Sequence, residues 1–275
     1  FVRRISMYPP PFEYAKAETL EEAVTLLSNT EGAVALAGGQ SLIPLLKLRI
    51  LSPPLVVDLN GVKELRFVES DRVGALARHY QLEEHSCLLL RQVAKRIGDP
   101  QIRTMGTLGG SLAHADPRSD WAAAMLAVDA IVTARGPSGF REIPIDIFFK
   151  GPYTTALERG ELITEVKFKC PPRSSYVKIS RRHNDFAIVA VAAAAAIEES
   201  HFQWVRVAAL GAAERPVRLR LVEERLQGAP VREDVIIEAA EAAKKEALPP
   251  SDLWASGEYR RALLAVAVKR ALAQL

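Results

Sequence analysis

The sequence contains few of the residues that build disulfide frameworks or metal clusters. Its 275 residues include only two cysteines, Cys87 and Cys170, which stand far apart in the chain. Two separated cysteines do not make an iron–sulfur or zinc site by themselves, and nothing in their spacing suggests a disulfide framework. A reducing cytoplasm is therefore the expected location of the protein.

The chain also lacks a dominant charge and a long apolar segment. It has 36 lysine and arginine residues against 33 aspartate and glutamate residues, a net charge of +3. This balance does not favour a nucleic acid or an acidic membrane as a partner. The longest apolar run, residues 187–197, is too short for a membrane span and is rich in alanine. The composition is typical of a globular protein with two or three domains.

The first six residues include two arginines, but no apolar segment of the kind found in signal peptides follows them. We expect Met7 to be the original start of the protein and residues 1–6 to be an extension.

Common catalytic motifs are missing as well. No G-x-G-x-x-G joins a strand to a helix, so a Rossmann dinucleotide site is not expected. There is no Walker A lysine, no H-E-x-x-H zinc motif and no serine in a nucleophile elbow. The five histidines lack the spacing of metal ligands, and only His114 is kept as a candidate, because it follows a glycine pair closely. Such a chain suits a protein whose reactive chemistry belongs to a bound cofactor.

Two glycine pairs, each followed by a small polar residue, stand out against these absences. The first lies in residues 37–41 (Ala-Gly-Gly-Gln-Ser), between an apolar strand and a helix that Ser41 is expected to cap. The second lies in residues 107–111 (Thr-Leu-Gly-Gly-Ser). Glycine allows a ligand to approach the backbone, and unpaired N–H groups at a helix start bind anions. Two such loops would hold the two phosphates of a dinucleotide; the alternative is two ordinary turns.

The rest of the chain predicts helices and strands on both sides of a linker. A capping box at Thr19 precedes an amphipathic helix that ends near Asn29. Asp116 or Asp120 either caps a helix from Trp121 or binds ribose hydroxyls, and the sequence leaves both open. Strands are expected at residues 55–59, 72–76, 130–135, 140–145 and 162–169, and a helix at residues 82–97.

Pro171-Pro172 is the best candidate for the linker. Beyond it, three strands are followed by three helices, which indicates an α+β layer with a three-stranded antiparallel sheet. The strands are expected at residues 176–180, 185–197 and 203–209, and the helices at residues 216–228, 234–248 and 257–275.

With both glycine segments in view, the sequence resembles the FAD-binding medium subunits of the molybdenum hydroxylases, the family of carbon monoxide dehydrogenase, xanthine dehydrogenase and aldehyde oxidoreductase. The family pattern A-G-G-x-S-L matches residues 37–42. The pattern T-x-G-G-S/N matches residues 107–111, inside a longer matching stretch at residues 101–117. Further matches lie at residues 8–14, 151–155 and 178–187, so the resemblance spans almost the whole chain.

The resemblance implies an α+β fold in three parts. Two α+β subdomains of the PCMH type, residues 1–56 and 57–172, would clasp FAD between them. A C-terminal α+β domain, residues 173–275, would follow with its three-stranded antiparallel sheet and helices. The segment at residues 69–73 looks shorter than in the family, so a hairpin there is expected to be trimmed.

The resemblance also implies the residues that contact FAD. Residues 36–42 and 107–111 would wrap the pyrophosphate, and Asp120 matches an acidic residue on the FAD ribose. Lys178 matches a lysine near the flavin ring, and Phe186 an aromatic residue beside it; the alternatives are a solvated lysine and a core phenylalanine. No catalytic or metal-binding residue is expected in this chain. The expected cofactor-binding residues are Leu36, Ala37, Gly38, Gly39, Gln40, Ser41, Leu42, Ile97, Thr107, Leu108, Gly109, Gly110, Ser111, Asp120, Ile163 (or its neighbour Thr164), Lys178 and Phe186.

The implied function is that of an electron-transfer subunit of an oxidoreductase. Substrate would be oxidised at a molybdopterin cofactor on a large subunit, and electrons would pass through 2Fe–2S clusters on a small subunit to FAD and an external acceptor. A dimer of such heterotrimers is the expected assembly. The sequence names neither the substrate nor the acceptor. The rival interpretations are a self-contained flavin oxidase and a non-enzymatic phosphate-binding scaffold.

Overall fold

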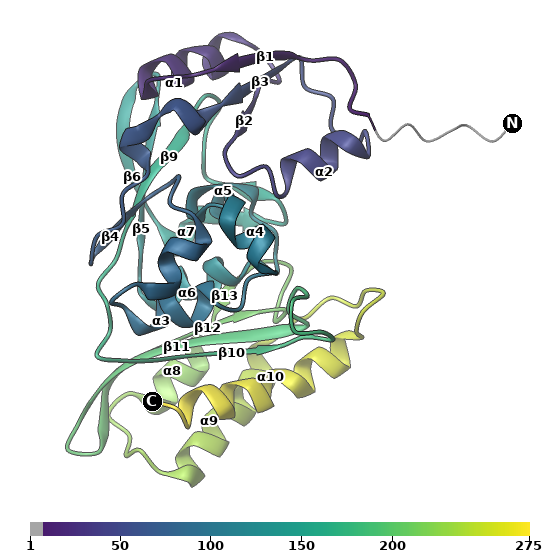
Figure 1. The fold of residues 1–275 in the computed structure, drawn as a ribbon. Coiled ribbons are helices and arrows are strands. Elements are labelled where there is room, and N and C mark those ends of the chain that lie inside the picture. The colour runs from purple at the N-terminus through teal and green to yellow at the C-terminus, as the bar shows by residue number, and fades with distance from the viewer. Residues whose placement is uncertain (1–7) are drawn as a thin grey trace, which may run out of the picture.

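The computed structural model describes residues 8–275 and arranges them in three layers (Figure 1). Each layer is a small sheet with its own helices, and the layers follow one another from the N-terminal to the C-terminal part of the chain. The expected α+β fold is thereby confirmed. The expected extension and Met7 lie outside the described residues.

The first layer is a parallel sheet covered by a short amphipathic helix. Its strands β1 (Glu13–Lys16), β2 (Val34–Leu36) and β3 (Leu55–Asp58) lie in the order β1-β3-β2. The helix α1 (Leu20–Asn29) begins where the Thr19 hydroxyl accepts the Glu22 N–H at 3.2 Å, which confirms Thr19 as the cap. The Glu22 carboxylate reaches back one residue further than a capping box requires and accepts the Glu18 N–H at 2.9 Å. The helix α2 (Leu42–Lys47) follows β2. The predicted boundary between residues 56 and 57 falls inside β3.

The middle layer is an antiparallel sheet with the helices that bury the largest core. Its strands lie in the order β4-β9-β5-β6, and the hairpin expected at residues 130–145 is β5 and β6. The predicted helix at residues 82–97 is instead split, because the Cys87 N–H bonds to the His85 imidazole at 2.9 Å and the helix starts only afterwards. The elements are β4 (Arg72–Gly74), α3 (Leu88–Ala94), α4 (Pro100–Met105), α5 (Leu108–His114), α6 (Asp120–Ala127), β5 (Ile131–Gly136), β6 (Gly139–Pro144), α7 (Ile145–Phe148), β7 (Phe149–Gly151), β8 (Thr154–Thr155) and β9 (Leu162–Lys167), with 3₁₀ turns at Leu59–Gly61, Lys63–Leu65 and His79–Glu84.

The third layer is an antiparallel sheet, β10-β11-β12-β13, with three helices on its outer face. The three expected strands are present, and a short fourth strand, β13, extends the sheet. The elements are β10 (Arg173–Ile179), β11 (Val189–Glu198), β12 (His201–Leu210), β13 (Val217–Arg218), α8 (Arg220–Leu226), α9 (Glu233–Glu246) and α10 (Gly257–Leu272).

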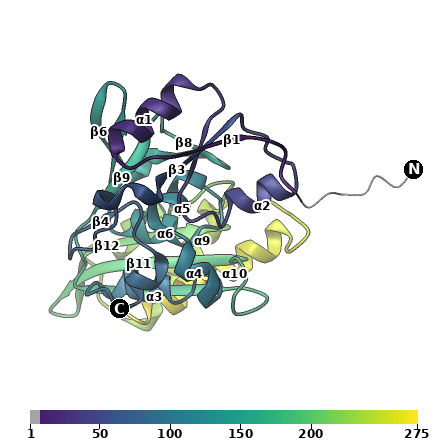
Figure 2. The same cartoon turned by 45° about the horizontal axis from the view of Figure 1, so that its top comes forward.

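The alanine-rich strand β11 is buried on both faces, which explains its composition. Ala190, Ala192 and Ala194 join the core around α6, whereas the intervening Val191 and Ala193 join the core beneath α9 and α10. Because successive side chains of a strand point to opposite faces, small residues let helices approach both sides. Figure 2 shows α5 and α6 between the N-terminal strands and this sheet. No helix among residues 8–275 is long and apolar enough to cross a bilayer.

The two cysteines form a disulfide, so the expectation drawn from their spacing is wrong. Cys87 lies at the start of α3 and Cys170 lies after β9, and their Cα atoms are 5.5 Å apart across a separation of 83 residues. Spacing along the chain does not reveal this contact, because the fold returns the end of β9 to the start of α3. The bond joins α3 to the segment that leads into the C-terminal layer.

We expect this disulfide to stabilise the chain measurably. A cross-link over a loop of this length removes conformational freedom from the unfolded chain, an effect of about 2–4 kcal/mol. The double variant Cys87→Ala/Cys170→Ala should therefore melt below the oxidised wild type, by roughly 5–15 °C. Thermal unfolding with and without reductant tests this. Wild type that has been unfolded and refolded in reductant should melt at a lower midpoint temperature than oxidised wild type, whereas reductant should not change the midpoint of the double variant. Equal melting midpoints for the oxidised wild type and the double variant would contradict the stabilising role of the bond.

Candidate functional site

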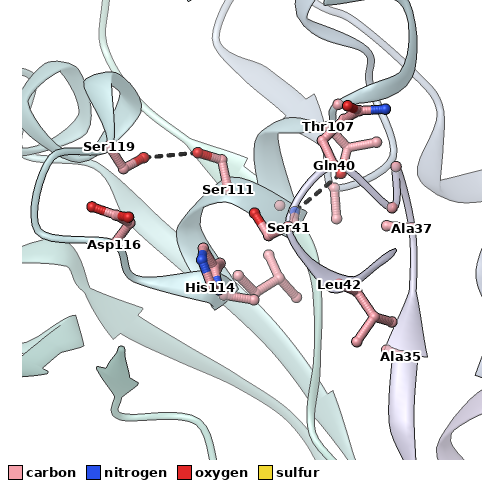
Figure 3. Close-up of a pocket in the computed structure, with 18 of the residues that line it drawn as sticks. Ala35, Ala37, Gln40, Ser41, Leu42, Thr107, Ser111, His114, Asp116 and Ser119 are labelled. Atoms are coloured by element: carbon pink, nitrogen blue, oxygen red, sulfur yellow. Dashed lines mark hydrogen bonds between the residues drawn. The ribbon is translucent and has the colours of Figure 1, made fainter. Parts of the chain in front are cut away.

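A cavity of about 540 Å³ opens between the first two layers, within the size range of sites for small ligands. One wall comes from β2 and the segment that leads into α2, and the other from α5 and the loop before α6. In Figure 3, Ala35, Ala37 and Leu42 lie on one side and Ser111, His114, Asp116 and Ser119 on the other, with Ser41 between them. The cavity therefore brings both glycine segments to one site.

The two glycine segments are fastened to each other by hydrogen bonds and by close backbone packing. Asn60 donates to the Ala37 carbonyl at 3.0 Å and accepts from the Arg78 guanidinium at 2.6 Å. Arg78 also donates to the Met105 carbonyl. A Cβ on Gly38 would lie 2.2 Å from that carbonyl oxygen, so only glycine fits there.

The first segment presents a row of unpaired backbone donors to the cavity. The N–H groups of residues 38–42 have no hydrogen-bond acceptor within residues 8–275. Gly39 turns the chain with a φ of 72°, a conformation that favours glycine. Ser41 occupies the N-cap position of α2, but its hydroxyl makes no capping bond, contrary to expectation. Both the N–H row and this hydroxyl are free to meet a ligand.

The second segment differs, because it is the first turn of α5 and its N–H groups are already used. Leu108 donates to the Ala77 carbonyl at 3.0 Å, Gly109 to the Ala75 carbonyl at 2.9 Å, and Gly110 to the Thr107 hydroxyl at 3.1 Å. The expectation of unpaired donors here is therefore wrong. Gly109 is required by packing instead, since a Cβ there would lie 2.5 Å from the Ala75 Cβ.

The loop before α6 supplies polar side chains at the far end of the cavity. The Ser111 and Ser119 hydroxyls share a hydrogen bond of 2.7 Å. Asp116 accepts the Arg118 N–H at 2.9 Å and the Tyr153 hydroxyl at 3.2 Å. Neither Asp116 nor Asp120 caps α6, because Ser119 holds the N-cap position. The helix-capping alternative is therefore wrong for both carboxylates, which line the cavity.

His114 also lines the cavity, beside the Tyr153 ring at a centroid distance of 5.2 Å. Burial lowers the pKa of His114, and Asp116 offsets this only in part. The imidazole is therefore neutral at physiological pH and able to give or accept one hydrogen bond on each nitrogen.

Asp120 forms a buried ion pair that joins the middle and C-terminal layers. The Lys178 ammonium lies 2.9 Å from its carboxylate and also donates to the Arg96 carbonyl at 2.9 Å. The Tyr176 hydroxyl donates to the other carboxylate oxygen. Burial raises the pKa of Asp120, opposed by the nearby ammonium and hydroxyl. The side chain of Lys178 is only 1% exposed, so the alternative of a solvated lysine is wrong.

Phe186 lies at the edge of the cavity. Among the described residues that line the cavity, it is the one that comes from the C-terminal layer. Its ring is 55% exposed, so the alternative of a core phenylalanine is also wrong. The Arg118 guanidinium stacks over the ring at 4.9 Å from its centroid. A cation–aromatic contact of this kind helps to hold the ring in its position at the cavity.

Most of the expected site residues line the cavity, but Leu36, Leu108 and Lys178 do not. Leu36 packs beneath Gly39, Leu108 is buried in the core of the middle layer, and Lys178 lies behind Asp120. The sequence did not predict the apolar residues that line the cavity, nor His79. The apolar residues carry no motif, so in the sequence they look the same as core positions. The lining residues that it missed include Val34, Ala35, Leu45, Leu51, Leu59, Leu76, Ile102 and Leu162.

Comparison with protein families agrees with this geometry. Residues 10–169 match the FAD-binding domain in molybdopterin dehydrogenase. Residues 174–275 match the C-terminal domain of the carbon monoxide dehydrogenase flavoprotein. The chain belongs to the FAD-binding medium subunits of the molybdenum hydroxylases.

Individual relatives cover the chain from end to end. The glyceraldehyde dehydrogenase medium chain of Sulfolobus acidocaldarius is 35% identical, over 98% of this chain and 100% of that protein. The carbon monoxide dehydrogenase medium chain of Hydrogenophaga pseudoflava is 34% identical, over 97% of each chain. The structure of carbon monoxide dehydrogenase from H. pseudoflava, solved without the Mo-pyranopterin moiety, superposes with a TM-score of 0.92 over 97% of each chain. These relatives are oxidoreductases, and this chain is an FAD-binding subunit of that class.

The buried ion pair generates a prediction about stability and pH. In Lys178→Met the Asp120 carboxylate stays buried without its cation, which costs about 3–5 kcal/mol at neutral pH. A carboxyl whose folded pKa is raised gives stability that is present at low pH and lost as pH rises through that pKa. The variant should therefore lose more stability at about pH 8 than at about pH 5, as measured by thermal unfolding.

The control is the double variant Asp120→Asn/Lys178→Met, which leaves no buried charge. It should recover stability relative to Lys178→Met at about pH 8 and lose the pH dependence. A Lys178→Met variant with wild-type stability at both pH values would mean that the Asp120–Lys178 ion pair does not stabilise the contact between the two layers.

Proposed function

We propose that the cavity between residues 37–42 and α5 holds the FAD and that the N–H groups of residues 38–42 bind its pyrophosphate. The observation that carries this proposal is the run of unpaired backbone donors facing one cavity. Successive N–H groups in a turn make a concave anion site. Among the described residues, no lysine or arginine lines the cavity. Backbone N–H groups, and not cationic side chains, would therefore meet the charge of the pyrophosphate.

The two ends of the cavity suit the other parts of FAD. Apolar side chains such as Ala35, Leu45 and Leu162 form a wall on which a flat ring can pack. Asp116, Asp120 and Ser111 offer oxygen atoms that accept hydrogen bonds from ribityl or ribose hydroxyls. FAD, when bound, supplies the redox chemistry, and the chain holds it, orients it and limits access to it.

The wider function is an electron relay in a larger enzyme. In this proposal, a large subunit oxidises substrate at a molybdopterin cofactor, and a small subunit with 2Fe–2S clusters passes the electrons to FAD and then to an external acceptor. A dimer of such heterotrimers is the proposed assembly. The named relatives support this, because they are medium chains of dehydrogenases and one structure is described by its molybdenum cofactor.

The rival, a self-contained flavin oxidase, needs a base that can remove a substrate proton near the flavin. Among the titratable side chains of the described chain that line the cavity, the neutral imidazole of His114 is the one left for this role, and the others do not favour it. Burial lowers the pKa of His79 to about 3, and Asp116 and Asp120 already accept hydrogen bonds from the chain. The scaffold rival is set aside by the family, which binds FAD.

A cytoplasmic location is part of the proposal. The Cys87–Cys170 bond tests it, because a disulfide that persists in the native host would argue against a reducing compartment. Disulfides are rare in reducing compartments outside hyperthermophiles. Thiol labelling of the protein from its native host would show both cysteines blocked if the bond persists there.

Replacement of Gly39 by alanine should weaken FAD binding without unfolding the chain. Gly39 has a φ of 72°, and an alanine there would push the backbone out of the cradle geometry. Gly228 has a φ of 74° with nothing within 4 Å of an added Cβ, and it lies in the C-terminal layer. Gly228→Ala is therefore a matched control with a similar backbone cost. We expect FAD affinity to fall at least about 10-fold for Gly39→Ala only, as two donors to phosphate are displaced.

Fluorescence titration of the deflavinated protein with FAD measures this. Equal FAD affinity in both variants and the wild type would contradict the assignment of the pyrophosphate to residues 38–42.

The relay proposal predicts that the isolated chain cannot turn over substrate. The pure, FAD-loaded chain should not oxidise aldehydes, purines or carbon monoxide, because the proposal assigns their oxidation to the molybdopterin cofactor of the large subunit. The chain purified from its native host should bring a small and a large subunit with it, and substrate should bleach the flavin absorbance of that complex. Robust turnover by the isolated chain would instead favour the oxidase.

A further inference from the structure

His79 is a buried histidine whose tautomer is set by its neighbours. The residue is 5% exposed and lies in the 3₁₀ turn that packs under α4. The Trp121 indole N–H donates to its Nδ1 atom at 3.0 Å. An indole nitrogen can only donate, so Nδ1 must be the acceptor and carry no hydrogen. The neutral imidazole therefore carries its hydrogen on Nε2.

That Nε2–H has no acceptor within residues 8–275, and His79 lines the cavity. The edge of the ring that carries Nε2 faces Gly106, where an added Cβ would lie 2.6 Å from Nε2. Gly106 in turn touches the first glycine segment, since a Cβ on Gly38 would lie 2.8 Å from the Gly106 Cα. His79, Gly106 and Gly38 thus follow one another toward the row of unpaired N–H groups.

From this geometry we propose that His79 donates a hydrogen bond from Nε2 to a phosphate oxygen of the bound FAD, with Trp121 fixing the tautomer that makes the donation possible. The inference deepens the proposed function and rests on it. The Nε2 atom is not among the fully buried side-chain atoms that lack a partner, so the cavity reaches it. A donor that faces a ligand site and has no acceptor in the described chain is available to an acceptor supplied by the ligand. Trp121 is a positioning residue in this arrangement, because it acts through His79.

The neutral state of His79 matches this role. Burial and the nearby Arg78 and Arg103 guanidinium groups lower its pKa to about 3. The ring therefore gives a hydrogen bond without adding a charge. Its donation does not vary with pH in the physiological range.

The chain contains a matched control in His85. It is also 5% exposed, and its Nδ1 accepts the Cys87 N–H at 2.9 Å. Its Nε2, however, already bonds to the Glu69 carbonyl at 2.8 Å, and His85 does not line the cavity. The two histidines thus carry the same tautomer, one with its donor free and one with its donor satisfied.

Nitrogen NMR of the full-length chain labelled on its histidine rings tests the proposal directly. In the deflavinated chain, His79 and His85 should both show the tautomer with hydrogen on Nε2. Addition of FAD should shift the His79 Nε2–H signal toward stronger hydrogen bonding and leave His85 unchanged. ADP, which carries the pyrophosphate, should reproduce the shift, and riboflavin, which has no phosphate, should not.

Substitutions provide a second measurement. His79→Asn retains an acceptor for Trp121 but has no group at the Nε2 position, so FAD affinity should fall about 10- to 100-fold, as expected for a bond to a charged group. His79→Gln retains a donor near Nε2 and should recover part of the affinity. Trp121→Phe frees the tautomer, so the NMR spectrum should show hydrogen on both nitrogens in exchange. His85→Asn should leave FAD affinity at the wild-type value.

Several results would overturn the inference. Hydrogen on Nδ1 of His79 in the wild type would contradict the tautomer. A His79 signal unmoved by FAD, with wild-type affinity in His79→Asn, would make the residue structural only. A shift with riboflavin and none with ADP would move the bond to the flavin ring. These failures are distinct from that of the pyrophosphate assignment, which the Gly39→Ala and Gly228→Ala pair tests without His79.

Discussion

The buried contact between Asp120 and Lys178 is the constraint on which the arrangement of the site depends. Removing both charges from water costs several kcal/mol for each ion, so the pair persists only because the Tyr176 hydroxyl and the Arg96 carbonyl complete its hydrogen bonds. The pair fixes the first turn of α6 against β10. Trp121, the next residue of α6, fixes His79 at the cavity. The C-terminal layer therefore controls the cavity through two adjacent residues of one helix.

The two glycine pairs look alike in sequence but perform different physical tasks. Residues 38–42 keep their N–H groups unpaired, whereas the corresponding groups of α5 are used by Ala75, Ala77 and Thr107. Glycine in the second pair allows α5 to approach β4 and its following turn, and glycine in the first allows the chain to turn and touch Met105. In the proposed binding mode, the first segment is therefore the anion cradle and the second is the surface that holds the cradle in place. A motif match alone does not separate these two tasks.

The sequence was sufficient for the fold class, the Thr19 cap of α1, the hairpin β5–β6 and the position of both glycine segments, because each depends on local pattern. It did not reveal the Cys87–Cys170 bond, the split helix at His85 or the cavity role of His79, since these depend on contacts between distant residues. The family resemblance implied a lysine near the flavin ring; in the structure Lys178 pairs with Asp120 and does not line the cavity. Long-range contacts decide which N–H donors are already satisfied within the chain, and sequence alone does not show which donors remain for a ligand.

The proposed cradle of backbone N–H groups and a neutral histidine would have a consequence for the cofactor. Lysine and arginine side chains would bind phosphate as charged partners, but they would also extend a positive potential along the cavity. Among residues 8–275, no lysine or arginine lines the cavity, and the charge of the Lys178 ammonium is balanced by the Asp120 carboxylate. In the proposed binding mode, pyrophosphate binding is thereby separated from the electrostatics of the flavin ring. The electrostatic influence on the ring would then come from the carboxylates that line the cavity, Asp116 and Asp120, and from the Arg118 guanidinium that stacks on Phe186.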